Sequence, residues 1–397
     1  MNAFFAIVFA SLLSRLGYQM ARSPVLPTFA ADLGALPELI GVVVAASTVT
    51  GVFFKLPAGA LSDVLGRKRM MVLGALFFAL PPFLYPLVHD AWSLIALRFV
   101  HGFATAIFSP VASAYVASLA DTGRGARLGW FSSANDIGGT AGPLIGGFVL
   151  YFTASYAVTY LTVGVLGVLT FIVVLLLPDV DRAAAREAKS FAARAAEFRQ
   201  GVAEVFRTPP ILVAAGIEAV MYLGYGAFLG FLPIYAKNAG LNDAQIAIVL
   251  GAQLAVAMAA KPITGRVSDR LGRIPIIVIG LLLCAGALPL IFRSESLTAF
   301  GLGASLLGLG VGAVTPVTNA LIADLASARR LGAAMGVFGT IWDIGEAAGP
   351  MIAGFLIGGL GYAGTFDVLA AVTVAAAVGV MALVRDPKTA AVDRDGV

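Results

Sequence analysis

Four acidic residues interrupt stretches of the chain that are otherwise apolar. Carboxyl groups in such surroundings can take up and release a proton, because a low-dielectric environment favours the neutral acid over the carboxylate. Asp136 lies about nine residues into its apolar stretch, hence roughly 14 Å deep at 1.5 Å per helical residue. Glu218 lies at a comparable depth, Asp343 takes the place of Asp136 in the second half of the chain, and Glu346 follows one turn later. We expect Asp136 and Glu218 to be the principal proton carriers.

Basic residues also lie within the apolar stretches. Arg15 and Arg98 are the natural counter-charges for the acids, and His101 stands one helical turn after Arg98 on nearly the same face. An arginine at the centre of a membrane helix costs about 2.5 to 3.5 kcal/mol on insertion scales, so it is usually functional. A histidine titrates near neutral pH. The alternatives are a static ion pair of Arg98 with Asp136 and a packing role for His101.

Long apolar helices must position these groups. The chain has 397 residues, of which 59% are hydrophobic and 12% charged, which excludes an ordinary soluble globular protein. About 20 apolar residues cross the hydrocarbon of a bilayer. We therefore predict an all-α membrane protein with twelve transmembrane helices. Their centres fall near Ser14, Thr48, Phe78, Phe108, Ala141, Leu166, Leu223, Leu254, Leu282, Gly310, Ile344 and Thr373.

The basic residues predict the orientation of the helices. Of 26 Lys and Arg residues, 19 fall in alternate loops, in the segment between the halves and at the C-terminus, and the positive-inside rule places those regions and both termini in the cytosol. The net charge of +4 is thus explained without a nucleic-acid partner. The first apolar stretch contains Arg15 and Arg22, so we interpret it as a retained helix and not as a signal peptide. These features predict a multi-pass protein of the inner (plasma) membrane.

An internal repeat divides the chain into two similar halves. GALSDVLGRKR at Gly59 returns about 206 residues later as GRVSDRLGRIP at Gly265, and NDIGGTAGPLIGG at Asn135 returns as WDIGEAAGPMIAG at Trp342. Repeats of this kind build the two bundles of many secondary transporters. We predict a six-helix bundle over residues 1–177, a cytosolic segment over 178–209 and a second six-helix bundle over 210–397. The middle segment mixes charges with apolar residues at helical spacing, which favours an amphipathic surface helix over a solvated linker.

The repeated sequences have a physical interpretation. Gly66 suits a tight turn between two helices, and Asp63 can meet the positive N-terminal end of a neighbouring helix. Gly138, Gly142 and Gly146 stand four residues apart and form a smooth stripe that lets another helix approach closely. Pro143, next to this stripe, removes a backbone donor and bends the helix.

These motifs resemble the major facilitator superfamily and, within it, the twelve-helix drug/proton antiporters. The resemblance covers essentially the whole chain. It implies export of a small molecule in exchange for protons, a part for Arg98 in proton transfer, and an antiporter motif in the fifth span. That motif comprises Gly129, Gly138, Gly142, Pro143, Gly146 and Gly147, and the second half repeats it with Ala353 in place of one glycine.

The resemblance also implies a latch that closes the cytosolic side. In the first half it comprises Gly59, Asp63, Gly66 and Arg67, with Asp121 as the partner of Arg67. In the second half it comprises Gly265, Asp269, Gly272 and Arg273. The sequence departs from the family at Val64, where the usual residue is an arginine such as Arg270 in the second copy.

The remaining expectations concern the substrate and the excluded classes. Five aromatic residues are candidates for an adaptable substrate cavity, namely Tyr18, Trp130, Tyr222, Tyr225 and Trp342. A polar or anionic metabolite, a sugar or a metal chelator is an alternative to a drug. A membrane-embedded enzyme is disfavoured, because the chain has two histidines, no metal-ligand spacing and no nucleotide-binding loop. We expect a monomer without a metal or other cofactor, and Cys284, alone in the chain, indicates nothing about the redox compartment.

Overall fold

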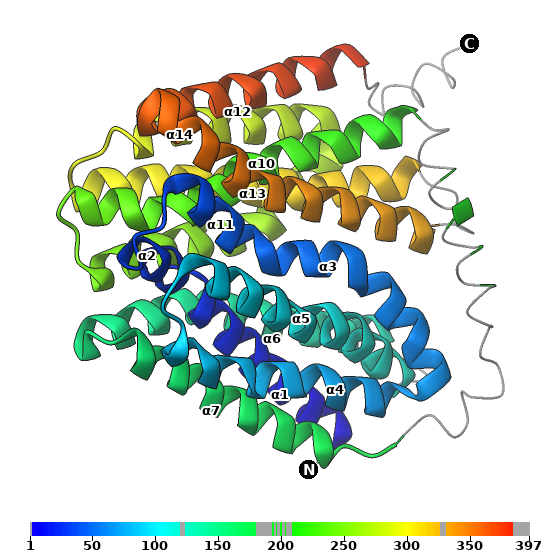
Figure 1. Ribbon diagram of the computed structural model, residues 1–397. Helices are drawn as coiled ribbons and strands as arrows, with labels where there is room; N and C mark the ends of the chain where they lie inside the picture. Colours follow the sequence, from blue (N-terminus) through cyan, green and yellow to red (C-terminus); the bar gives the residue numbers. More distant parts are fainter. Residues whose placement is uncertain are drawn as a thin grey trace, which may run out of the picture. The chain divides into compact units, whose positions relative to one another are not determined.

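The computed structural model describes residues 2–119, 124–179, 209–325 and 331–383, together with residues 193, 196, 199, 200 and 203. Every regular element in these ranges is a helix (Figure 1). The first half contains α1 (Ala3–Arg22), α2 (Val25–Asp32), α3 (Pro37–Leu65), α4 (Arg67–Ala79), the 3-10 helix η1 (Pro81–Leu87), α5 (Ala91–Ser118), α6 (Arg124–Thr153) and α7 (Tyr156–Leu175). The second half contains α10 (Pro209–Asn238), α11 (Asp243–Leu271), α12 (Arg273–Ile291), α13 (Leu297–Leu325) and α14 (Leu331–Leu383).

Local sequence signals account for several helix ends. The Asp90 carboxylate accepts hydrogen bonds from the backbone N–H groups of Trp92 and Ser93, each at 2.9 Å, and so caps the N-terminus of α5. Gly66 between α3 and α4 has a φ of 97°, and Gly272 between α11 and α12 has a φ of 96°. A residue with a Cβ is strained in this conformation. The turn expected at Gly66 is therefore present in both halves.

Ten helices of the described residues are long and apolar enough to cross a membrane. Two helices, α6 and α14, account for the difference between these ten spans and the predicted twelve. Helix α6 is 30 residues long, but its glycine, serine, asparagine and aspartate residues lower its mean hydropathy, and it is not among the ten. Helix α14 is counted once, although its 53 residues include Gly361, whose φ of 65° and ψ of −179° are not helical. The multi-pass, all-helical architecture is confirmed for the described residues.

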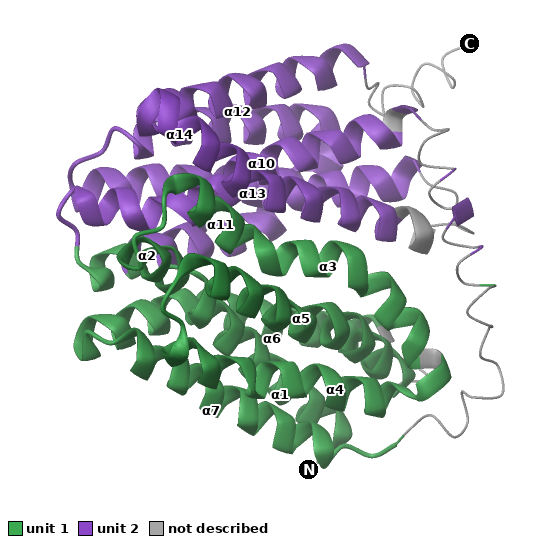
Figure 2. Ribbon diagram, viewed as in Figure 1, with its two compact units in different colours: residues 1–194, 242–247 green, residues 195–241, 248–397 purple. Residues whose placement is uncertain are grey.

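The chain forms two compact units (Figure 2). Unit 1 comprises residues 1–194 and 242–247, and unit 2 comprises residues 195–241 and 248–397. The predicted cytosolic segment lies largely outside the described residues. In unit 1, α1 packs against α6 and α7, and α5 packs against α3 and α4. In unit 2, α10 packs against α14, and α12 packs against α13 and α14.

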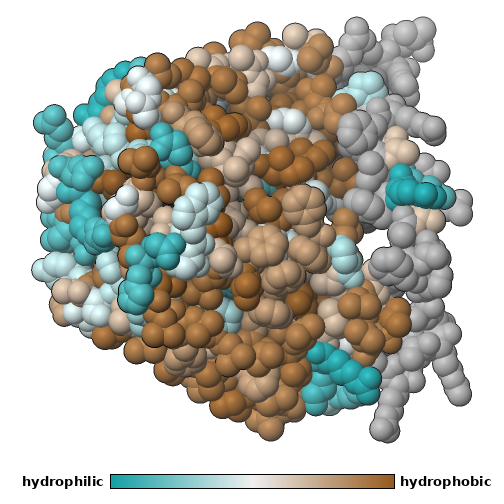
Figure 3. Space-filling model, viewed as in Figure 1, coloured by the Kyte–Doolittle hydropathy of each residue, from teal (hydrophilic) through white to brown (hydrophobic). Residues whose placement is uncertain are grey.

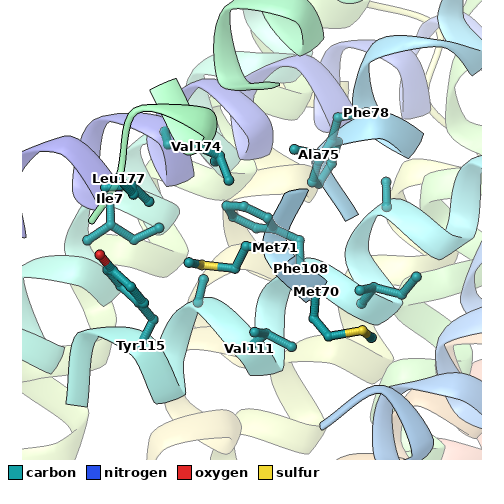
Figure 4. Packing of buried hydrophobic residues seen from close by; sticks show 14 of the residues in the cluster. Ile7, Met70, Met71, Ala75, Phe78, Phe108, Val111, Tyr115, Val174 and Leu177 are labelled. Carbon is teal, nitrogen blue, oxygen red and sulfur yellow. The ribbon is translucent and has the colours of Figure 1, made fainter. Parts of the chain in front are cut away.

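A cluster of buried apolar side chains fills unit 1 between α1, α4, α5 and α7 (Figure 4). Met71 and Phe108 lie at its centre in the view, and Ile7, Tyr115 and Leu177 lie together at one side. Tyr115 donates a hydrogen bond from its hydroxyl group to the backbone oxygen of Pro178 at 2.9 Å. The end of the first half of the chain is thereby held against α5.

Apolar side chains also cover the outside of the helices. Figure 3 shows hydrophobic residues over most of the helices on the visible face, whereas hydrophilic residues gather at the left, where turns between helices lie. Phe53, Trp130 and Phe152 are 66%, 71% and 77% exposed. Exposed side chains of this size are typical of a lipid-facing surface.

Glycines bring two pairs of helices into close contact. A Cβ on Gly138, Gly142 or Gly146 of α6 would meet a backbone oxygen of α1 at 2.7 to 2.8 Å. Those oxygens belong to Leu12, Leu16 and Met20. In unit 2, Gly345 and Gly349 of α14 lie against the backbone oxygens of Ala219 and Leu223 of α10. The glycine stripe inferred from the sequence is thus a helix contact, whereas Gly129 of α6 faces open space.

Candidate functional site

Glu218 is a buried carboxyl group of unit 2. It lies on α10 with 1% of its surface exposed, and its Oε2 atom has no hydrogen-bond partner among the described residues. Thr315 and Thr318 of α13 are close enough to interact with the carboxyl group. A buried carboxylate with an unsatisfied oxygen is costly, so the neutral acid is favoured in this environment. The local arrangement can therefore store a proton.

Two further acids of unit 2 lie on α14, which packs against α10. Asp343 is 5% exposed and Glu346 is 8% exposed. Both interact with other groups of the protein. Gly345, between them in the sequence, is the residue that touches the backbone of α10 at Ala219. The glycine contact thus brings the helix that carries these two acids against the helix that carries Glu218.

Aromatic residues lie beside these acids. Tyr222, one turn after Glu218 on α10, has its ring centroid 4.5 Å from that of Trp342 on α14 and 5.8 Å from that of Tyr225. The Tyr225 hydroxyl group donates to Oε1 of Gln253 on α11 at 3.3 Å. Three of the five aromatic residues predicted to line a cavity are therefore neighbours in unit 2. Tyr18 is buried in unit 1, and Trp130 is exposed on α6.

Arg98 is the main buried charge of unit 1. It lies on α5, is fully buried, and donates a hydrogen bond from Nη2 to Oγ of Ser47 on α3 at 2.7 Å. The centre of its guanidinium group stands 5.3 Å from the ring centroid of Tyr18, which is within cation–π range. His101 is also fully buried, and its Nδ1 atom is 3.1 Å from the hydroxyl oxygen of Tyr85 on η1.

Asp136 and Arg15 occupy a different environment from Arg98. The Asp136 side chain is exposed, on a side of α6 that does not carry the glycine contact with α1. Arg15 of α1 is partly buried and lies near Gly139 of α6. The hydrogen bond of Arg98 goes to Ser47 and not to the ion-pair partner considered from the sequence. Asp136 nevertheless has an interaction of its own.

The second copy of the latch motif forms an ion-pair network. Nη1 of Arg273 is 2.6 Å from Oδ1 of Asp269, and its Nε is 3.1 Å from Oδ2 of Asp324 at the end of α13. Nη1 also donates to Oγ of Ser268 at 2.7 Å. At the repeat offset, Asp324 corresponds to Ser118 and not to Asp121. In the first copy, Asp121 and the side chain of Asp63 lie outside what the structure describes.

Several residues around Arg98 and Glu218 belong to none of the motifs found in the sequence. Ser47, Tyr85 and Tyr160 surround Arg98, and Gln253 and Thr318 lie near Glu218 or its neighbours. Thr315, which also lies near Glu218, is the counterpart of Ser109 at the repeat offset. Within the described residues, no group of three or more His, Cys, Asp or Glu side chains could hold a metal ion.

Comparisons with known proteins all indicate the same family. The chain matches the Major Facilitator Superfamily over residues 7–242 and 214–396. It is 27% identical to the uncharacterized MFS-type transporter MJ1560 of Methanocaldococcus jannaschii, over 87% of the chain and 88% of the relative. It is 25% identical to the quinolone resistance protein NorA of Staphylococcus aureus, over 84% of each. The crystal structure of the nucleoside transporter NupG superposes with a TM-score of 0.82 at 13% identity, over 97% of the chain and 100% of NupG.

Proposed function

The chain belongs to the major facilitator superfamily, and on this premise we propose that it exports small molecules, such as drugs or drug-like metabolites, in exchange for protons. Export proceeds by alternating access of two six-helix bundles, with residues 178–209 as the cytosolic segment between them. The protein acts as a monomer in the inner (plasma) membrane, with both termini in the cytosol. NorA, a relative over most of the chain, is named for quinolone resistance, which supports a drug as the substrate.

The lengths of two helices support twelve spans. At 1.5 Å per residue, the 53 residues of α14 would extend roughly 80 Å, more than twice the thickness of the hydrocarbon core. The non-helical backbone at Gly361 divides α14 into two pieces that can each cross the bilayer once. Helix α6, with 30 residues, is long enough to cross despite its lower hydropathy. Counting α6 and both pieces of α14 with the nine other spans gives twelve.

The observation that carries the proposal is the buried carboxyl group of Glu218. A transporter that exchanges a proton for a substrate needs an acid that is neutral in one state and charged in another. Glu218 is 1% exposed and has an unsatisfied Oε2 atom, so any rearrangement that admits water or a cationic substrate favours loss of its proton. Asp136, exposed on α6, is the second proton carrier. Tyr222, Tyr225 and Trp342 provide adaptable apolar surface for the substrate.

The driving force is sufficient for such an exchange. One charge that moves through 100 mV releases about 2.3 kcal/mol, and each 1.4 kcal/mol corresponds to a factor of ten. One proton therefore sustains roughly a fiftyfold gradient of a neutral substrate. A polar or anionic metabolite is the second candidate substrate, and the buried cation Arg98 favours it.

Everted membrane vesicles test the direction and the coupling. Respiration acidifies their lumen, and the addition of a transported compound should release part of the proton gradient, reported by a pH-sensitive dye. A panel containing quinolones, lipophilic cations and polar anionic metabolites distinguishes the two candidate substrate classes. Vesicles without the protein are the control. If no compound changes the gradient and none accumulates in the vesicles, the proposal of proton antiport is wrong.

A further inference from the structure

The positive charge of Arg98 has no acidic partner in the part of the chain that the structure describes. Its hydrogen bond goes to the neutral hydroxyl group of Ser47, and the ion pairs found among the described residues do not include it. Its Nε and Nη1 atoms have no hydrogen-bond partner there, although the residue is fully buried. A buried guanidinium group without a carboxylate partner is costly and calls for compensation by an opposite charge.

The groups around Arg98 offer hydrogen bonds but no negative charge. Tyr18 from α1, Tyr85 from η1 and Tyr160 from α7 are the groups that interact with it electrostatically. The rings of Tyr85 and Tyr160 stack with centroids 3.9 Å apart, and both side chains are fully buried. The local potential is therefore positive.

His101 contributes a second unsatisfied nitrogen to the same region. Its ring centroid is 5.2 Å from that of Tyr18, the ring that also contacts Arg98. If the Tyr85 hydroxyl group donates to Nδ1, the proton of the neutral imidazole is on Nε2. Nε2 has no partner among the described residues. Arg98 and His101 then both present N–H donors from one face of α5.

We propose that unit 1 binds one small monovalent anion, of the chloride class, beside Arg98 and His101. The anion neutralises the guanidinium group and accepts hydrogen bonds from its Nε and Nη1 atoms. A single charge suffices, because one buried cation is unbalanced at this place. A weakly hydrated anion fits best, since the surrounding aromatic rings cannot replace a tightly bound water shell. This site is independent of the proposed function, because it requires no transport step.

The test is the thermal stability of the purified full-length protein at constant ionic strength. When gluconate is replaced by chloride, the melting temperature should rise by a few degrees and saturate as a single site fills, since a ligand that binds only the folded state stabilises it. Bromide and nitrate should act similarly, and sulfate should not. Arg98→Gln should remove the dependence on chloride. Arg293→Gln, which removes an exposed arginine paired with Asp367, should retain it.

A second variant tests the site if Arg98→Gln fails to fold. Arg98→Lys retains the charge and should keep a saturable response to chloride at a higher concentration. Isothermal titration of the wild-type protein with sodium bromide measures the site without any substitution. Equal stability of the wild-type protein in chloride and gluconate, or an unchanged response in Arg98→Gln, would overturn the proposal.

Discussion

Glu218 and Arg98 are buried ionisable residues of opposite sign, and each lies within a different unit. Neither has a buried partner of opposite charge among the described ion pairs. The two residues differ in how they avoid the cost of burial. A carboxyl group can become neutral by binding a proton, whereas a guanidinium group keeps its charge. On this difference we base the proposal that Glu218 exchanges the proton and that Arg98 supplies a fixed positive potential.

Substitution of the two candidate acids should separate their roles. Glu218→Gln keeps the shape of the side chain but removes the titratable proton, so we expect at least about a tenfold loss of proton-coupled transport, the low end of what a positioned acid or base contributes. Binding of substrate should change little. Asp136→Asn tests the second carrier in the same way, and Glu295→Gln, an exposed acid after α12, is the matched control. Full coupling in Glu218→Gln would exclude this residue as a carrier.

Asp90 gives a prediction about pH. Hydrogen bonds from the Ser93 backbone and side chain, and from the Trp92 backbone, lower the pKa of its carboxyl group. Because the folded-state pKa is depressed, the stability that Asp90 contributes is present above its unfolded pKa of about 3.9 and is lost as the pH falls through the folded value. Asp90→Ala should therefore lower the melting temperature at pH 7, and the difference from wild type should shrink below about pH 4.

The control for this prediction is a cap without charge. Ser155 caps α7 through a hydrogen bond from the Val158 backbone at 3.3 Å. Ser155→Ala should lower the melting temperature by a similar amount at neutral and acidic pH. A pH-independent effect of Asp90→Ala would contradict the lowered pKa.

At the scale of helices, the glycine contacts determine which elements touch. The backbone of α1 lies against Gly138, Gly142 and Gly146, and the backbone of α10 lies against Gly345 and Gly349. The same motif therefore makes a corresponding contact in each half. In unit 2 this contact places the acids of α14 next to the helix that bears Glu218. The close packing of α14 against α10 therefore also determines how near Asp343 and Glu346 lie to the helix of Glu218.

Alanine at two glycines of α6 should have opposite effects on stability. A Cβ at Gly142 would stand 2.7 Å from the Leu16 oxygen and 2.7 Å from Cβ of Gln19, so Gly142→Ala should destabilise unit 1 by about 1 to 3 kcal/mol. Gly129 has nothing within 4 Å of the equivalent position. Gly129→Ala should be neutral or stabilise by up to about 1 kcal/mol, because alanine is the better helix former. Thermal unfolding in detergent measures both, and similar losses would contradict the contact.

The sequence predicted these elements better than it predicted the sites. Hydropathy was sufficient to predict an all-helical membrane protein, and the turn expected at Gly66 is present and recurs at Gly272. Spans and tight turns depend on local composition. The partners of Arg98 were not predictable. Ser47, Tyr85 and Tyr160 come from three different elements, and their approach depends on how those helices pack. Likewise, the spacing of the latch motif did not predict that Arg273 would pair with Asp324.

At the scale of the molecule, the two halves share a motif pattern but differ in buried charge. Unit 1 contains the fully buried Arg98, whereas unit 2 contains Glu218, Asp343 and Glu346, each less than 9% exposed. Duplication explains the shared turns and glycine contacts. The charges have diverged, with Asp343 the counterpart of the exposed Asp136 and no acid of unit 1 matching Glu218. We expect an exporter of this design to place proton exchange mainly in its second bundle.

The most direct test uses the purified protein in sealed proteoliposomes with an imposed pH gradient. An acidic lumen should drive accumulation of a substrate identified in everted vesicles, with matching loss of protons from the lumen. Reversal of the gradient should reverse the substrate flux, and Glu218→Gln should reduce both fluxes by at least about tenfold. A substrate flux that does not depend on the pH gradient, or no flux across the sealed bilayer, would contradict proton-coupled export.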